Sequence, residues 1–195
     1  LTAGSKAAPE TGSDGSGYTL ARSLGHRIVR PLPALVQLRC KEKIFEKLAG
    51  VRMDAKVEVY TEKKLLASDQ GEGQFTKNGI SGIPVFQVSR YAVRALDVGE
   101  KVQAVLNLMP LFDETQFLTF LKNRREQNSY KHGEQFLTGL LPAKMIGCVL
   151  ERSGLAKGKK RAEDWTETEL ARLAHAILHF ETEITGSGDF SQAQV

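Results

Sequence analysis

The sequence lacks several features that would assign it to a protein class directly. It has only two cysteines in 195 residues, Cys40 and Cys148, far apart and without metal-ligand spacing. This argues against a disulfide-rich secreted domain and against a cysteine zinc site. No apolar run approaches the ~20 residues that a membrane helix needs, and no signal peptide heads the chain. We therefore expect a cytoplasmic protein with reduced thiols and no membrane partner.

The common catalytic signatures are also missing. The chain has no G-x-S-x-G elbow, P-loop or H-E-x-x-H motif, and no carboxylate pair stands out from the solvated faces. The net charge of +4 is mild. Its densest basic run, Lys157–Arg161, has no interleaved aromatic residues, which favours a solvated loop over a nucleic-acid partner. The composition, with 41% hydrophobic and 26% charged residues, is that of an ordinary globular protein.

Several segments alternate apolar and polar residues with a period of two, which is typical of strands with one buried face. The clearest runs from Val51 to Tyr60, and Leu65–Ser68 can pair back on it as a hairpin. Val102–Leu108 and Phe180–Ile184 are predicted as later strands, and the short apolar run Ala34–Leu38 as a buried strand. Together they predict an antiparallel β-barrel or curved sheet.

Helical signals dominate between the last two predicted strands. Asp113 with Gln116 can form an N-terminal capping box, as can Thr166 with Glu169. Further helices are predicted over Glu134–Leu141 and from Pro142 to a stop at Gly154, and an early one ends at Gly25. The predicted fold is therefore α+β, without a Rossmann-type FAD domain. We expect a linker and short helix over 1–26, a barrel-like lobe over 27–111 plus 180–195, and an inserted helical lobe over 112–179.

The most informative stretch is Gly71–Arg90, which reads GEGQFTKNGISGIPVFQVSR. A strand end near Phe75 is followed by Asn78-Gly79 and Gly82, and Pro84 then suits the first turn of a helix. The pattern predicts a strand, a tight glycine turn and a helix N-terminus. Such a turn presents backbone N–H groups to an anion or a carbonyl oxygen, although the glycines can also serve only to make a corner.

This stretch resembles a motif of the flavoprotein family that includes aminoacetone oxidase and BaiN-like proteins, F-T-x-N-G-I-S-G-I-P-V-F-Q-x-S-R. Two other segments are similar to the same family. Leu1–Tyr18 resembles its "LATGGK…P.TGS.GDGY" segment, and Thr185–Val195 resembles "TG…F..AQV". The resemblance spans nearly the whole chain, with motifs at both ends and in the middle.

The resemblance implies FAD as the cofactor of a longer parent protein. Family members bind it through a G-x-G-x-x-G turn that is absent from this chain, so we expect a central insert that binds no FAD alone and partners the missing FAD-binding domain. The family's first motif lies beside the flavin, and by position it corresponds to Thr2, Ala3, Gly4, Ser5 and Lys6. Ala3 and Ser5 depart from the family's usual Thr and Gly.

The same resemblance suggests that Asn78, Gly79, Ile80, Ser81 and Gly82 face the flavin or a small-molecule substrate. Lys77 departs from the His, Asp or Glu of many relatives. Our hypothesis is that the chain is a substrate-side lid or wall of an FAD-dependent oxidoreductase and is itself inactive. The alternative is an interaction or oligomerisation module that uses the helical lobe, which a large exposed apolar patch on those helices would favour.

The histidines give only a weak metal signal. His175 and His179 lie four apart on a predicted helix, a spacing that can bind a metal ion. No third ligand has a defined spacing to them, although Glu181 and Glu183 are near in sequence. Exposed or edge-packed histidines are the simpler interpretation, so no metal site is predicted.

Overall fold

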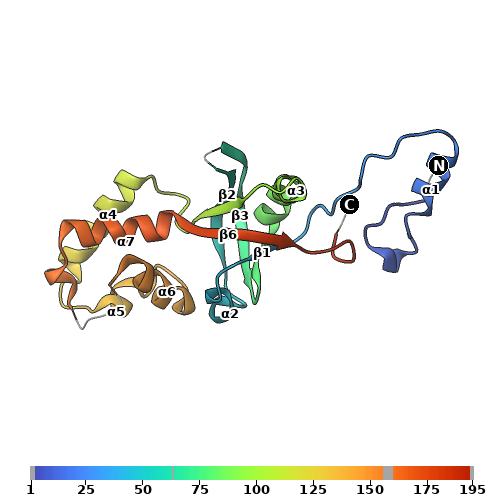
Figure 1. Cartoon of the computed structure of the whole chain (residues 1–195). Coiled ribbons are helices and arrows are strands. Elements are labelled where there is room, and N and C mark those ends of the chain that lie inside the picture. Colours follow the sequence, from blue (N-terminus) through green and yellow to red (C-terminus); the bar gives the residue numbers. More distant parts are fainter. Residues whose placement is uncertain (1–2, 63, 156–159, 194–195) are drawn as a thin grey trace.

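The fold is a closed antiparallel barrel with helices at both ends (Figure 1). A computed structural model of the chain describes residues 3–62, 64–155 and 160–193. The strands follow the order β1-β4-β3-β2-β5-β6, and β1 pairs with β6 to close the barrel. The predicted α+β fold with an antiparallel barrel is confirmed. The strands are β1 Leu38–Cys40, β2 Arg52–Thr61, β3 Lys64–Thr76, β4 Gly79–Gly82, β5 Val102–Asn107 and β6 Phe180–Ser187.

The alternating segments form strands as predicted, because their apolar faces line the barrel. Ala55, Val57 and Val59 of β2 are buried, and β5 and β6 show the same alternation. Two strand predictions are wrong in extent. Ala34–Leu38 is not a strand, because Leu35 has a left-handed φ of 52° and extended pairing begins only at Leu38. The partner of β2 is much longer than Leu65–Ser68 and continues to Thr76.

Three phenylalanines fill the centre of the barrel. Phe45, Phe75 and Phe180 come from α2, β3 and β6, and all three are fully buried. Their ring centroids are 6.1 to 6.4 Å apart, with Phe180 edge-on to the other two rings. Edge-to-face aromatic packing of this kind adds to the stabilisation from buried area.

The helices lie on two sides of the barrel. α3 packs against β2, β3, β4, β5 and β6, while α4 to α7 follow β5 and precede β6 on the opposite side (Figure 1). No described helix is long and apolar enough to cross a membrane. The division into 27–111 plus 180–195 and 112–179 stays a prediction of domain organisation. The helices are α1 Ser16–Ser23, α2 Ile44–Leu48, α3 Ile83–Asp97, α4 Glu114–Gln127, α5 Gly133–Leu137, α6 Ala143–Ser153 and α7 Glu167–Leu178.

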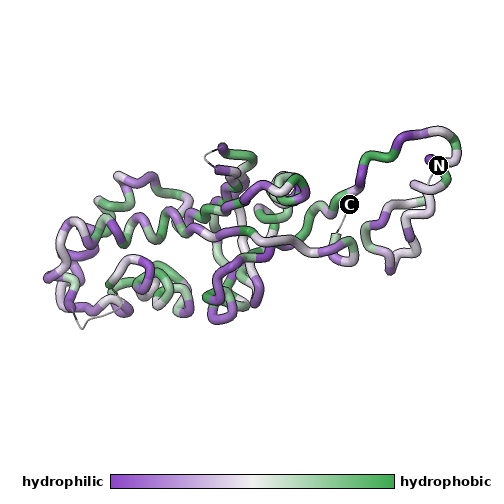
Figure 2. The backbone as a smooth tube through the Cα atoms, in the orientation of Figure 1, coloured by the Kyte–Doolittle hydropathy of each residue, from purple (hydrophilic) through white to green (hydrophobic). Residues whose placement is uncertain are grey.

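Local capping fixes the ends of several helices. Both predicted capping boxes are present, with Asp113 and Gln116 at α4 and Thr166 and Glu169 at α7. Gly154 ends α6 with a φ of 78°. The second helix of this group is shorter than predicted and ends at Leu137, because the following Gly139 has a left-handed φ. Hydrophobic and hydrophilic residues alternate along these helices (Figure 2), as expected for helices with one packed face.

We expect the capping box of α7 to make stability depend on pH. A hydrogen bond from Lys160 and one from the Thr166 N–H lower the pKa of Glu169 from 4.5 to about 2. Because the folded pKa is depressed, this stabilisation is complete above about pH 4.5 and is lost as pH falls towards 2. Glu169→Gln can still complete the capping box but loses the charge that pairs with Lys160, so it should cost less than about 1 kcal/mol at neutral pH. It should also reduce the pH dependence of thermal unfolding in that window. An NMR titration of Glu169 that finds an ordinary pKa would contradict this.

Candidate functional site

The N-terminal motif forms a loop that packs against itself. Thr2 lies outside the described residues. Gly4 has a φ of 72°, and a Cβ there would lie 2.5 Å from Cβ of Ser13. Ser13 Oγ donates to the Ala7 carbonyl, and Ser5 Oγ accepts from the Ala7 N–H, both at 3.0 Å. Gly4, Ser5 and Ser13 therefore stabilise the loop itself.

The two terminal motifs meet beside α3. The Ala8 N–H donates to the Phe190 carbonyl at 3.0 Å, and the Gly188 N–H donates to the Gln37 carbonyl at 2.9 Å. A second, smaller core joins these segments to α3, and Leu32 packs against it. Its buried members are Ala7, Val36, Val93 and Ala193. The described segments near both termini consequently lie on the α3 side of the barrel, away from α4 to α7 (Figure 1).

The central motif reaches this region through Ser89, near the middle of α3. Ser89 is buried, and its Oγ donates to the Phe86 carbonyl at 2.8 Å and accepts from the Val36 N–H at 3.3 Å. This hydroxyl therefore joins α3 to the N-terminal segment. The structure thus brings together parts of all three motifs that are far apart in sequence.

The predicted glycine turn over Asn78–Gly82 is wrong in its geometry. The turn lies at Lys77 and Asn78, and Gly79–Gly82 form β4, which pairs with β1 on one side and β3 on the other. In these two ladders, β4 uses backbone N–H and C=O groups that we expected to be free to bind a ligand. The Ile80 side chain is only 1% exposed and belongs to the barrel core. It therefore cannot present its side chain to a substrate outside the barrel.

The two ends of β4 point to different parts of the molecule. The Asn78 carbonyl accepts from the Cys40 N–H at 2.8 Å, at the end of β1 that leads into α2. Gly82 lies at the other end and is the N-cap of α3. A strand of this length separates the ends by roughly 13 Å. The candidate residues Asn78 and Gly82 therefore cannot act as one compact site.

The start of α3 lies directly after β4. No side chain caps this helix, and Pro84 occupies its first turn. The first N–H groups of a helix have no partner within it and lie at the positive end of its dipole. Ile83 is 65% exposed, so this helix end is accessible.

A groove lined by residues of β5, β6 and α6 escaped the sequence analysis. Its volume is about 580 Å³, and Arg152 of α6 lines it together with Glu42 and Thr182. The Arg152 guanidinium lies 3.8 Å from the Phe180 ring centroid and donates to the Glu181 carbonyl at 2.8 Å. Burial raises the pKa of the nearby Cys40 thiol to about 12, which keeps this thiol protonated at neutral pH. No local pattern marks Arg152, because these partners come from other elements.

The comparison with known proteins agrees with this architecture. Residues 32–195 match the family described as HI0933-like protein barrel and H2TH domain. The chain belongs to the HI0933-like family. Over all 195 residues it is also 42% identical to the 3-dehydro-bile acid delta(4,6)-reductase of Clostridium scindens, and it spans 47% of that protein's length. The resemblance to the aminoacetone oxidase and BaiN-like flavoproteins is thereby confirmed.

Membership of the HI0933-like family accounts for the barrel, which the family description names. The matched residues include the central and C-terminal motifs but begin after the N-terminal one. The N-terminal motif is covered by the similarity to the reductase. The roles of Ala3–Lys6 and of Asn78–Gly82 stay predictions.

Proposed function

We propose that this chain is the barrel-and-helix part of an FAD-dependent oxidoreductase and forms a wall beside a flavin bound by another domain of the same protein. The observation that carries the proposal is the contact between the terminal motifs, Ala8 with Phe190. When one domain is inserted into another, the first and last residues of the inserted domain usually lie close together, where the chain connects the two domains. The similarity to a reductase about twice the length of this chain supports the same arrangement.

The α3 side of the barrel is the face proposed to meet the FAD-binding domain. Large apolar side chains are exposed along it, including Val29 at 86%, Val98 at 71% and Ile83 at 65%. Exposed apolar residues of this kind mark interaction surfaces when they gather on one side. The loop with Ala3, Gly4, Ser5 and Lys6 also belongs to this side and is proposed to lie against the cofactor.

The chemistry of the proposed site is divided between the flavin and this chain. FAD supplies electron transfer, and the protein contributes position, polarity and exclusion of water. Of the candidate β4 residues, Ser81 and Gly82 lie at the end next to α3, and the uncapped amides of α3 follow them. These amides can hold a substrate oxygen or a flavin oxygen that carries negative charge. The substrate is proposed to be a small molecule, and the protein to be cytoplasmic.

Charge placed at Ile83 tests this face in the full-length flavoprotein. We expect Ile83→Glu to lower the FAD content per polypeptide and the turnover by about tenfold or more, because the contact would have to desolvate the new carboxylate. The carboxylate would also compete with the bound oxygen for the positive end of α3. The control is Leu111→Glu at another exposed apolar residue, before α4, which should leave both the FAD content and the turnover unchanged. Flavin absorbance in the visible range and steady-state rates are the measurements.

Two results would overturn the proposal. If Ile83→Glu keeps the flavin content and turnover of the wild type, α3 does not face the cofactor. If the full-length protein is colourless and cannot be loaded with FAD, the assignment as a flavoenzyme fails. In that case the interaction module becomes the better explanation. At present the helical lobe gives it little support, because Tyr130 is the only large apolar side chain that is exposed among the described residues 112–155 and 160–179.

A further inference from the structure

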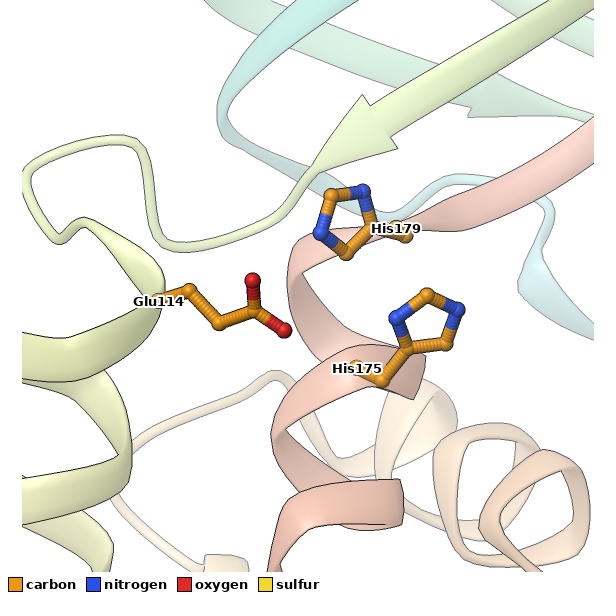
Figure 3. Close-up of side chains that lie close together, drawn as sticks. All are labelled: Glu114, His175 and His179. Atoms are coloured by element: carbon orange, nitrogen blue, oxygen red, sulfur yellow. The ribbon is translucent and has the colours of Figure 1, made fainter.

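Two histidines and a glutamate from separate helices gather beside the barrel (Figure 3). His175 lies in α7, His179 caps its C-terminal end, and Glu114 opens α4. One ligand atom of each side chain lies within 4.8 Å of the other two. The third ligand that the sequence did not reveal is therefore supplied by another helix rather than by Glu181 or Glu183.

The backbone positions of these residues are fixed by local structure. The i, i+4 spacing places both imidazoles on one face of α7, with their ring centroids 4.6 Å apart. The capping box of Asp113 fixes the start of α4 and with it the position of Glu114. The Leu108 N–H donates to the Ile177 carbonyl at 3.1 Å, which holds the connection before α4 against α7. The fold therefore fixes the backbone positions of all three residues of the cluster.

The ligand set matches a transition metal ion. Zinc binds histidine nitrogens and carboxylate oxygens at about 2.0–2.2 Å, so ligand atoms around one tetrahedral ion lie roughly 3.3 Å apart. The Glu114 and His175 side chains are exposed, so both have room to rotate towards this spacing. Three protein ligands leave a fourth position for water. Imidazole ligands favour Zn²⁺, Ni²⁺ or Cu²⁺ over Mg²⁺ and Ca²⁺.

The surrounding charges define which groups can contribute. Glu58 of β2 lies near His179, but its carboxylate is already paired with Lys56 at 2.6 Å and Tyr60 at 2.8 Å. Arg152 and Arg172 line a second groove, which is separate from the one described above and is also lined by His175 and His179. Arg152 is held by Phe180 and the Glu181 carbonyl. Glu114 is therefore the carboxylate that completes the set.

We propose that Glu114, His175 and His179 bind one divalent transition metal ion that clips the start of α4 to the end of α7. The chain passes from β5 to α4 through residues 108–113 and returns from α7 to β6 at His179. The cluster spans both connections, so a bound ion would link the start and the end of the helical segment. Its proposed role is structural, and it goes beyond the proposed function because it requires neither flavin nor substrate.

Zinc titration of the chelator-treated 195-residue chain tests this site. We expect one ion per chain by calorimetry and a rise of roughly 5 °C or more in the thermal unfolding midpoint when Zn²⁺ is about 100-fold above its Kd. His175→Ala and Glu114→Gln should each weaken zinc binding by more than about tenfold. Substitution of a residue that only hydrogen-bonds to a metal ligand already costs about tenfold or more in affinity, and loss of a ligand itself should cost at least as much. Co²⁺ in place of Zn²⁺ should give visible absorption bands of a tetrahedral site.

The control is His26→Ala, which removes an exposed histidine elsewhere in the chain and should leave zinc binding unchanged. Circular dichroism of the zinc-free variants verifies that each one is folded before titration. The proposal is overturned if the wild type shows no saturable binding, or if His175→Ala binds zinc as the wild type does. It is equally overturned if Glu114→Gln leaves the affinity unchanged, because the glutamate is then not a ligand. None of these outcomes depends on the flavoenzyme assignment.

Discussion

Replacing Gly82 by alanine should destabilise the protein by about 4 kcal/mol. Gly82 has a φ of 101°, and a Cβ built there would lie 2.5 Å from the Glu72 carbonyl oxygen. It would also lie 3.0 Å from Cα of Gly73, so the obstacle is backbone rather than a movable side chain. The new methyl group has to push β3 away from β4, which opens the barrel where α3 begins. Urea denaturation, followed by circular dichroism, measures the loss in free energy of unfolding.

The matched control for this substitution is Gly147→Ala. Gly147 is an exposed residue within α6, and no atom lies within 4 Å of a Cβ built there. Since alanine is the better helix former, this change should stabilise the protein by up to about 1 kcal/mol. A Gly82→Ala variant as stable as the wild type would show that β3 and β4 are not packed this closely. The same argument makes Gly79 and Gly82 unsuitable for testing cofactor contact, since substitutions there would disturb the barrel first.

Phe180→Ala should cost about 4 kcal/mol of stability, the second large effect that we expect. The Phe180 ring is fully buried and packs edge-on against Phe45 and Phe75. Its loss leaves a cavity between β6, α2 and β3 and removes the aromatic face under Arg152. The barrel cannot easily collapse into this cavity, because strand pairing on both sides fixes the position of β6.

The thermal and urea-induced unfolding of Phe180→Ala can be compared with that of Tyr130→Ala. Tyr130 is 63% exposed, so its truncation should change the free energy of unfolding by less than about 0.5 kcal/mol. Phe180→Leu should fall between the two, because it retains most of the buried volume. If Phe180→Ala loses less than about 1.5 kcal/mol, the three-ring cluster is not the centre of the core.

Much of the secondary structure could be predicted because its causes are local. Alternation from Met53 to Val59 and from Val102 to Leu106 is enough to define a strand with one buried face. The capping boxes of α4 and α7 also depend on residues three positions apart. These elements agree with the sequence because neighbouring residues carry the whole signal.

The secondary-structure predictions that were wrong concern segments whose conformation depends on residues far away in the sequence. Gly79–Gly82 has the composition of a turn, but it forms a strand because β1 and β3 pair with it from both sides. The C-terminal half of β3 contains Gly71 and Gly73, which disfavour strands in isolation. The whole strand nevertheless stays extended, because it forms ten ladder pairs with β2. In both cases pairing with distant segments outweighs the local preference.

The sequence by itself determined the family, the α+β class, the strands that alternate and the capped helices, because each rests on a motif or on residues close in the chain. Only the tertiary structure decided that the barrel closes through β1 and β6, and that Ala8 meets Phe190 beside α3. It alone placed Glu114 next to His175 and His179. These contacts join residues far apart in sequence, so no pattern within one segment can specify them. They arise when closing the barrel fixes where each helix starts and ends.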